Sequence, residues 1–121
     1  MTDDTSSSLP WVICLCAQWC GTCREYRPLL AQLAREQPGM RFAWVDIEDH
    51  ADIADAFDIE IFPTLLIVSA AGTHFLGPLQ PRIEALARLL AAPQPARPPS
   101  EAESVLIAAL QARPQVFAVE D

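Results

Sequence analysis

The sequence predicts an α/β fold in which helices flank a mixed β-sheet. Nearly all-apolar short segments alternate along the chain with segments whose apolar residues recur at helical spacing. A Gly-containing turn joins the last two apolar segments as a hairpin. The chain of 121 residues is 51% hydrophobic, which suits one domain with a substantial core.

The first half of the chain predicts a strand, a helix and a second strand. Residues 11–17 are almost all apolar, as in a strand covered on both faces. Residues 21–36 predict a helix that Pro28 kinks, and residues 41–46 a second strand. The apolar residues at helical spacing are Tyr26, Leu29, Leu30, Leu33 and Ala34.

The second half predicts a short helix over 50–57, a hairpin of strands 64–68 and 73–76, and a helix over 80–91. Strand–helix–strand units imply parallel pairing, whereas the hairpin is antiparallel. The expected order is therefore β-α-β-α-β-β-α.

The ends of the chain predict four segments. Residues 1–9 form a flexible tail, residues 10–92 the domain, and residues 93–99 a Pro-rich extended spacer. Residues 100–121 begin with a capping box of Ser100 and Glu103 and continue as a helix to about 112, with a short strand over 115–119. The predicted apolar face of this helix consists of Val105, Leu106, Ala109 and Leu110.

Charge and hydropathy exclude several classes of partner. The net charge of −8, with no Lys, disfavours nucleic acid and anionic membranes. No apolar run is long enough to span a membrane, and the acidic, polar N-terminus differs from a secretory signal, so we expect a cytoplasmic protein. The acidic residues of 46–60, Asp46 among them, indicate a solvated face, with a docking patch as the alternative.

Four cysteines lie within ten residues: Cys14, Cys16, Cys20 and Cys23. A disulfide-stapled domain would spread its cysteines, so this cluster indicates one chemical site. Cys20 and Cys23 open the first helix, where the positive end of the helix dipole favours a thiolate. Cys20 is the predicted nucleophile and Cys23 the resolving thiol. Taken alone, the spacing also fits half of a zinc site or two unremarkable thiols.

The surrounding residues resemble the thioredoxin family. The run Trp19-Cys20-Gly21-Thr22-Cys23 stands at a strand-to-helix junction, and Ile61-Phe62-Pro63-Thr64 resembles the family's cis-proline segment. Pro28 and Gly77 match the family's helix proline and the glycine after the hairpin, so the resemblance covers residues 11–91.

The resemblance implies a thiol–disulfide oxidoreductase that reduces or exchanges protein disulfides without an organic cofactor or metal. Electrons would come from a thioredoxin-reductase-like protein or a small thiol. Trp19, Gly21, Thr22, Phe62 and Pro63 would contact the substrate, with Gly21 permitting close approach of the two sulfurs. A binding module or assembly chaperone with little redox turnover is the alternative, and a metallochaperone a third.

The sequence departs from the family in its proton-transfer groups. Cys14 stands where the family has a buried Asp beneath the resolving cysteine, and Trp44 stands where it has the Lys that pairs with this Asp. Thr22 replaces the Pro between the two cysteines of the motif. We therefore expect slow turnover near neutral pH. Cys14 and Cys16 lie on one face of the strand and are interpreted as small buried hydrophobes, with a second redox or metal role as the alternative.

The family's first strand and helix also have no counterpart, since ten residues precede Trp11. Our hypothesis is that the extra C-terminal helix and residues 115–119 cover the exposed edge at 41–46, in the same chain or across a homodimer. The alternative is a helix docked elsewhere and a frayed tail. Trp11 and Trp44 are predicted in the core, and His50 and His74 at the surface.

Overall fold

A computed structural model describes residues 10–92 and 94–119. The predicted tail, residues 1–9, lies outside the described residues. The strands are β1 (Trp11–Cys16), β2 (Arg41–Asp46), β3 (Thr64–Ser69) and β4 (Gly72–Pro78). The helices are α1 (Gly21–Glu36), α2 (Ala51–Ala54) with the 3-10 turn η2 (Asp55–Phe57), α3 (Ile83–Ala91), α4 (Glu101–Ala112) and α5 (Pro114–Phe117).

The four strands form one mixed sheet in the order β2-β1-β3-β4, which confirms the predicted α/β class. β1 pairs with β2 in parallel, with Trp11 opposite Arg41, and with β3 antiparallel. β3 and β4 form the expected hairpin. The central position of β1 explains its all-apolar sequence, because neighbouring strands flank it on both sides and helices cover both its faces.

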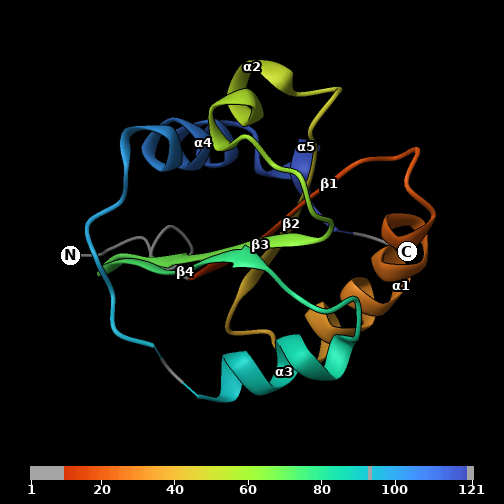
Figure 1. Cartoon of the computed structure of the whole chain (residues 1–121). Helices are drawn as coiled ribbons and strands as arrows, with labels where there is room; N and C mark the ends of the chain where they lie inside the picture. The colour runs from red at the N-terminus through yellow and green to blue at the C-terminus, as the bar shows by residue number, and fades with distance from the viewer. Residues whose placement is uncertain (1–9, 93, 120–121) are drawn as a thin grey trace.

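Helices cover both faces of the sheet (Figure 1). α1 and α3 pack on one face, where Val12, Cys14 and Cys16 of β1 point. α4, α5 and the residues around α2 pack on the other face, against Trp11, Ile13 and Leu15. The alternation along β1 therefore sends Cys14 and Cys16 toward α1, the helix that carries Cys23.

The C-terminal segment contacts both outer strands of the sheet. Arg97 pairs with Thr73 of β4, and Ala118 pairs with Ala43 of β2, so backbone groups at both edges find hydrogen-bond partners. Gly72 (φ 133°) allows this approach, because a Cβ there would run into the Arg97 carbonyl. At the β2 edge this contact is thus made within the chain by the segment after α4, whereas α4 itself packs on a face of the sheet.

An ion pair between the half-exposed Arg97 and the buried Glu103 holds the start of α4 against the sheet. The Glu103 carboxylate, fully buried, accepts hydrogen bonds from the Thr73 hydroxyl (2.8 Å) and from Arg97 (2.7 and 3.0 Å). Ser100 and Glu103 also form the predicted capping box. Three segments that are separate in the sequence therefore meet at one carboxylate.

Two expectations for this region are wrong in detail. Residues 115–119 are a helical turn, α5, followed by a single bridge at Ala118, because the turn begins with Pro114, which suits a first helical position. Val105 is exposed, whereas Leu106 and Leu110 are buried. Residues 94–99 of the predicted extended spacer contain no helix, and Arg97 within them pairs with Thr73 of β4.

Candidate functional site

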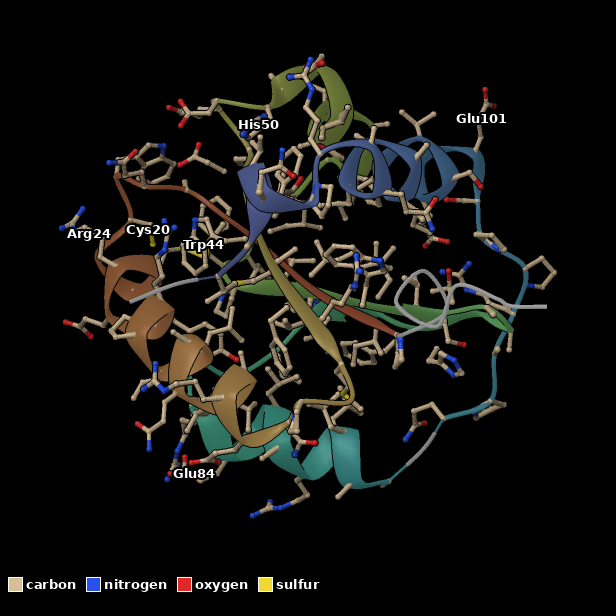
Figure 2. The ribbon with its side chains drawn as sticks, turned by 180° about the vertical axis from the view of Figure 1, so that it is seen from behind. Cys20, Arg24, Trp44, His50, Glu84 and Glu101 are labelled. Carbon is tan, nitrogen blue, oxygen red and sulfur yellow. A yellow bond between two sulfur atoms is a disulfide. The ribbon has the colours of Figure 1, made fainter. Side chains whose placement is uncertain are left out.

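Cys20 stands at the N-terminal end of α1, as its N-cap residue (Figure 2). The Cys20 carbonyl accepts from the Arg24 N–H at 3.1 Å, and the sulfur makes no capping hydrogen bond. The side chain is half-buried and carries a free thiol. The helix dipole therefore acts on a sulfur that solvent reaches and that no capping bond engages.

Cys23 lies one turn into α1 and is fully buried. In the structure its sulfur is bonded to Cys16, the last residue of β1, with the two Cα atoms 5.9 Å apart. The Ala17 N–H also points at the Cys23 sulfur, at 3.4 Å. The disulfide is thus not the predicted Cys20–Cys23 pair, and the interpretation of Cys16 as a plain buried hydrophobe is wrong.

Cys14 is a free, fully buried thiol on the same face of β1. Burial raises the pKa of Cys14 well above its ordinary value, and the Arg27 charge lowers it only slightly. Cys14 is therefore a neutral thiol at physiological pH, as expected for a small buried hydrophobe. The neighbouring Tyr26 hydroxyl is buried as well, and burial raises its pKa.

The segment before β3 lies beside the cysteines. The Phe62–Pro63 peptide bond is cis, as the resemblance implies. Phe62 packs against the core cluster that contains Cys16, Cys20 and Cys23. The Trp19 ring meets the Phe62 ring edge to face, with centroids 5.6 Å apart. Trp19, which precedes Cys20, is 59% exposed, and Ile61, which precedes Phe62, is 60% exposed, so both segments present apolar surface.

Asp46 fixes the loop that leads to Cys20. Its carboxylate accepts hydrogen bonds from the backbone N–H groups of Gln18 (2.7 Å), Glu48 (2.9 Å) and Asp49 (3.1 Å). Burial alone would raise the pKa of Asp46, but these three bonds hold it below its ordinary value. Asp46 is buried, so its assignment to a solvated face is wrong.

Cys16 and Asp46 are the site residues whose roles sequence reasoning missed. The available signal was position: both end neighbouring parallel strands, at the same edge of the sheet, where residues 17–20 also begin. In this structure, where Cys23 is bonded to Cys16, a Cβ at Gly21 would meet only the Arg24 guanidinium, at 3.8 Å. Gly21 and Thr22 are exposed beside Cys20.

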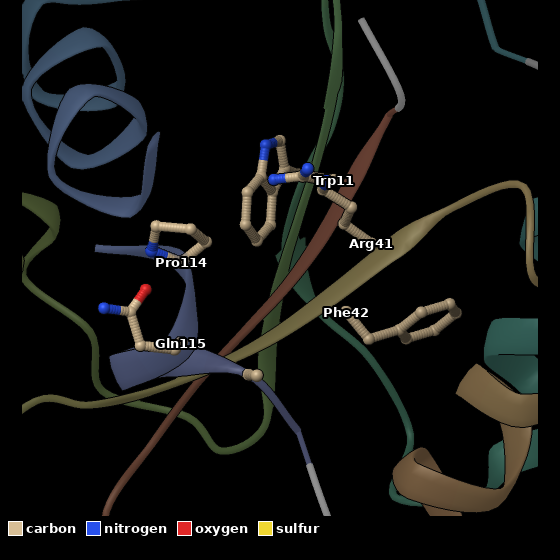
Figure 3. A pocket seen from close by; sticks show the side chains of 6 residues that line it. Trp11, Arg41, Phe42, Pro114 and Gln115 are labelled. Atoms are coloured by element: carbon tan, nitrogen blue, oxygen red, sulfur yellow. The ribbon is translucent and has the colours of Figure 1, made fainter. Parts of the chain in front are cut away.

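One pocket of the described residues lies at the other end of β2 from Asp46. This pocket of about 390 Å³ opens between β2 and α5, lined by Trp11, Arg41, Phe42, Pro114, Gln115 and Ala118 (Figure 3). It contains no nucleophile. Among the described residues, no three His, Cys, Asp or Glu side chains come together as a metal site. No helix in the described ranges is long and apolar enough to cross a membrane.

The motif, the cis-proline segment and the sheet topology agree with a comparison to known families. The family model described as Thioredoxin matches residues 3–87. The chain belongs to the thioredoxin family. Thioredoxin C-3 of Corynebacterium nephridii is 37% identical over 65 residues, which is 54% of this chain and 45% of that protein. Mitochondrial thioredoxin of Mus musculus is 38% identical over 64 residues, 52% of this chain and 39% of that one.

The aligned part of the chain spans about half the length, or less, of these curated thioredoxins. Among solved structures, Fasciola hepatica thioredoxin superposes with a TM-score of 0.63 and 25% identity, over 69% of this chain and 80% of that one. Oxidised thioredoxin O1 of Arabidopsis thaliana gives a TM-score of 0.62 at 24% identity, over 74% of this chain and 81% of that one. These likenesses support the thioredoxin fold for about seven tenths of the chain.

Proposed function

We propose that the protein is a thiol–disulfide oxidoreductase that reduces or exchanges protein disulfides, with Cys20 as nucleophile and Cys23 as resolving thiol. The observation that carries the proposal is the position of Cys20. Its free sulfur caps no backbone group, stands at the positive end of α1, and lies among exposed apolar residues. An accessible cysteine at a helix N-terminus is the placement found for reactive thiols, and the apolar residues beside it suit a protein substrate.

The proposed reaction starts from the fully reduced protein. The Cys20 thiolate attacks one sulfur of a substrate disulfide, and the other substrate sulfur leaves as a thiolate. Cys23 then attacks the Cys20 sulfur of the mixed disulfide and releases the second substrate thiol. The protein is left with a Cys20–Cys23 disulfide, and two electrons have passed to the substrate. A thioredoxin-reductase-like protein or a small thiol returns these electrons.

Deprotonation of Cys23 is the slow part of this scheme. Cys14, on the strand beneath it, is a neutral thiol whose raised pKa prevents it from acting as a base near neutral pH. The Asp46 carboxylate already accepts three backbone N–H bonds. The proton of Cys23 therefore goes to water or to the substrate. We expect Cys23 to attack the mixed disulfide more slowly than it would with a buried carboxylate as base.

The substrate surface we propose consists of Trp19, Gly21, Thr22, Phe62 and Pro63. The first three adjoin Cys20, and Phe62 joins them through its edge-to-face contact with Trp19. Trp19, Gly21 and Thr22 are exposed and Phe62 is half-buried, which suits an extended segment of a protein with a disulfide, while Pro63 is buried behind them. A reducing compartment such as the cytoplasm would supply the electron donor and maintain the thiols.

The test is reduction of insulin disulfides with dithiothreitol as electron donor. Wild type should exceed the uncatalysed rate, Cys20→Ser should lose the activity, and Cys23→Ser should accumulate a mixed disulfide with substrate. Arg24→Ala, which changes an exposed neighbour, serves as a control for the helix end. Wild-type activity equal to that of Cys20→Ser would overturn the proposal.

A binding module is the second candidate, and one observation favours it. While Cys23 is bonded to Cys16, Cys20 has no resolving thiol, and the exposed Trp19 and Ile61 offer an apolar docking surface. Such a protein would hold a partner without turnover. Pull-down of the same partner by wild type and Cys20→Ser, without insulin reduction, is its expected signature.

A further inference from the structure

Cys23 has two sulfur neighbours in this fold. Cys20 is the N-cap of α1 and Cys23 is the third residue of the helix, so their side chains share the first turn. Cys16 comes from the end of β1, and its Cα lies 5.9 Å from that of Cys23, inside the ordinary range for a disulfide. Cys16, Cys20 and Cys23 all pack in one core cluster.

The backbone on the Cys16 side is fixed by the sheet. Cys16 stands opposite Asp46 in the parallel pairing of β1 with β2, and its carbonyl accepts from the Ile47 N–H at 2.9 Å. On the other side, Cys23 lies within the hydrogen-bonded first turns of α1. Both positions follow from the fold itself, so the Cys16–Cys23 bond needs no movement of strand or helix.

We propose that Cys16 is a third redox residue, which exchanges with Cys20 for the sulfur of Cys23. The Cys20 thiolate attacks Cys23, the Cys16–Cys23 bond breaks, and a Cys20–Cys23 bond forms. Cys16 leaves as a thiolate and takes up the proton that Cys20 lost. One disulfide exists before and after the step, so no electron enters or leaves the protein.

The two oxidised isomers differ in what they present to solvent. In the Cys16–Cys23 isomer both bonded sulfurs are fully buried, and Cys20 remains a half-exposed thiol. A protein reductant cannot reach that disulfide directly, so reduction proceeds through Cys20. In the Cys20–Cys23 isomer the free thiol is Cys16, which is fully buried and therefore out of reach of a protein partner. Exchange therefore regulates whether Cys20 acts alone or with Cys23.

Disulfide mapping of the full chain tests this inference. The protein is equilibrated with reduced and oxidised dithiothreitol, quenched with acid, alkylated in denaturant and digested with chymotrypsin. Cleavage after Leu15, Trp19 and Tyr26 separates Cys16 from the peptide that carries Cys20 and Cys23. The buried isomer joins two peptides with Cys20 alkylated, whereas the Cys20–Cys23 isomer keeps its disulfide within one peptide.

Wild type should show the Cys16–Cys23 link, and Cys20→Ser should show that link alone. Cys16→Ser should show only the Cys20–Cys23 disulfide. Cys14→Ser is the matched control, because Cys14 is also buried on the same face of β1. This variant should give the same disulfide links as wild type. Absence of the Cys16–Cys23 link from oxidised wild type would overturn the inference.

A second measurement is independent of the mapping. The Cys16–Cys23 isomer adds to the oxidised population of the protein. Removing Cys16 should therefore lower the equilibrium constant for oxidation of the protein by oxidised dithiothreitol. If the buried isomer is about ten times as abundant as the other, the constant should fall by about elevenfold in Cys16→Ser. Cys16→Ala should agree, which separates this effect from the added hydroxyl. An unchanged constant beside an abundant buried isomer would contradict the exchange.

The inference rests on the proposed function for its biological meaning, yet the two fail separately. If the Cys16 link forms and exchanges but no variant reduces insulin faster than background, the exchange stands and the oxidoreductase proposal falls. If Cys16→Ser and wild type reduce insulin equally and the link is absent, the oxidoreductase proposal stands and the third redox residue falls.

Discussion

Neutralising Glu103 should destabilise the protein at neutral pH and remove part of its sensitivity to acid. Burial alone would raise the pKa of Glu103, but Arg97, the Ser100 N–H and the Thr73 hydroxyl lower it from 4.5 to about 2. A carboxyl group whose pKa is lower in the folded state stabilises that state above its unfolded pKa. The contribution is lost as the pH falls toward 2.

The lowered pKa gives the size of the effect. A difference of about 2.5 units, from 4.5 to about 2, corresponds to about 3 kcal/mol of stabilisation at pH 7. With the same two pKa values, roughly 1.5 kcal/mol remains at pH 3. In Glu103→Gln the amide oxygen still accepts from Thr73 and Ser100, but its NH₂ group faces the Arg97 guanidinium. We expect a loss of about 2–3 kcal/mol at pH 7.

Urea unfolding of wild type and Glu103→Gln at pH 7 and pH 3 measures this effect. The difference in unfolding free energy between them should shrink by about half between the two pH values. Glu101→Gln is the matched control, because Glu101 lies in the same first turn of α4 but is exposed, and its variant should stay within about 0.5 kcal/mol of wild type. An equal loss for Glu103→Gln at both pH values would refute the linkage argument.

Three further predictions follow from single contacts. Leu106→Ala should lower the unfolding free energy by about 2–5 kcal/mol in urea titration, because Leu106 is fully buried where α4 meets the sheet; a change below about 1 kcal/mol would contradict that packing. Asp46→Asn should speed hydrogen exchange at the Gln18 amide, since an NH₂ group would replace one of the accepting oxygens; unchanged protection would argue against the loop-fixing role. Iodoacetamide should alkylate Cys20 and spare Cys14 in the native oxidised protein, as peptide mass spectrometry would show, because Cys14 is buried and neutral; rapid labelling of Cys14 would exclude its placement.

Much of the local structure could be predicted from the sequence, because it depends on neighbouring residues. The all-apolar run of β1, the helical spacing of α1 and the Ser100–Glu103 capping box each contain their own evidence, and the structure has all three. The motif around Cys20 and the proline at 63 likewise carry enough information to place the family. Trp11 and Trp44 are buried, as expected of core aromatics.

The sequence by itself determined that four cysteines lie close together, where a buried strand leads into a helix. Only the tertiary structure decided which sulfurs meet, because that depends on the sheet register and on the height of α1 above β1. Spacing along the chain favours Cys20 as the neighbour of Cys23, whereas the packing of α1 on β1 brings Cys16 within bonding range. The position of Asp46 was also decided by the tertiary structure. Its charge predicts a surface position, but the end of β2 holds its carboxylate where the Gln18 amide donates to it. Contacts between distant segments are set by packing, which a linear pattern does not record.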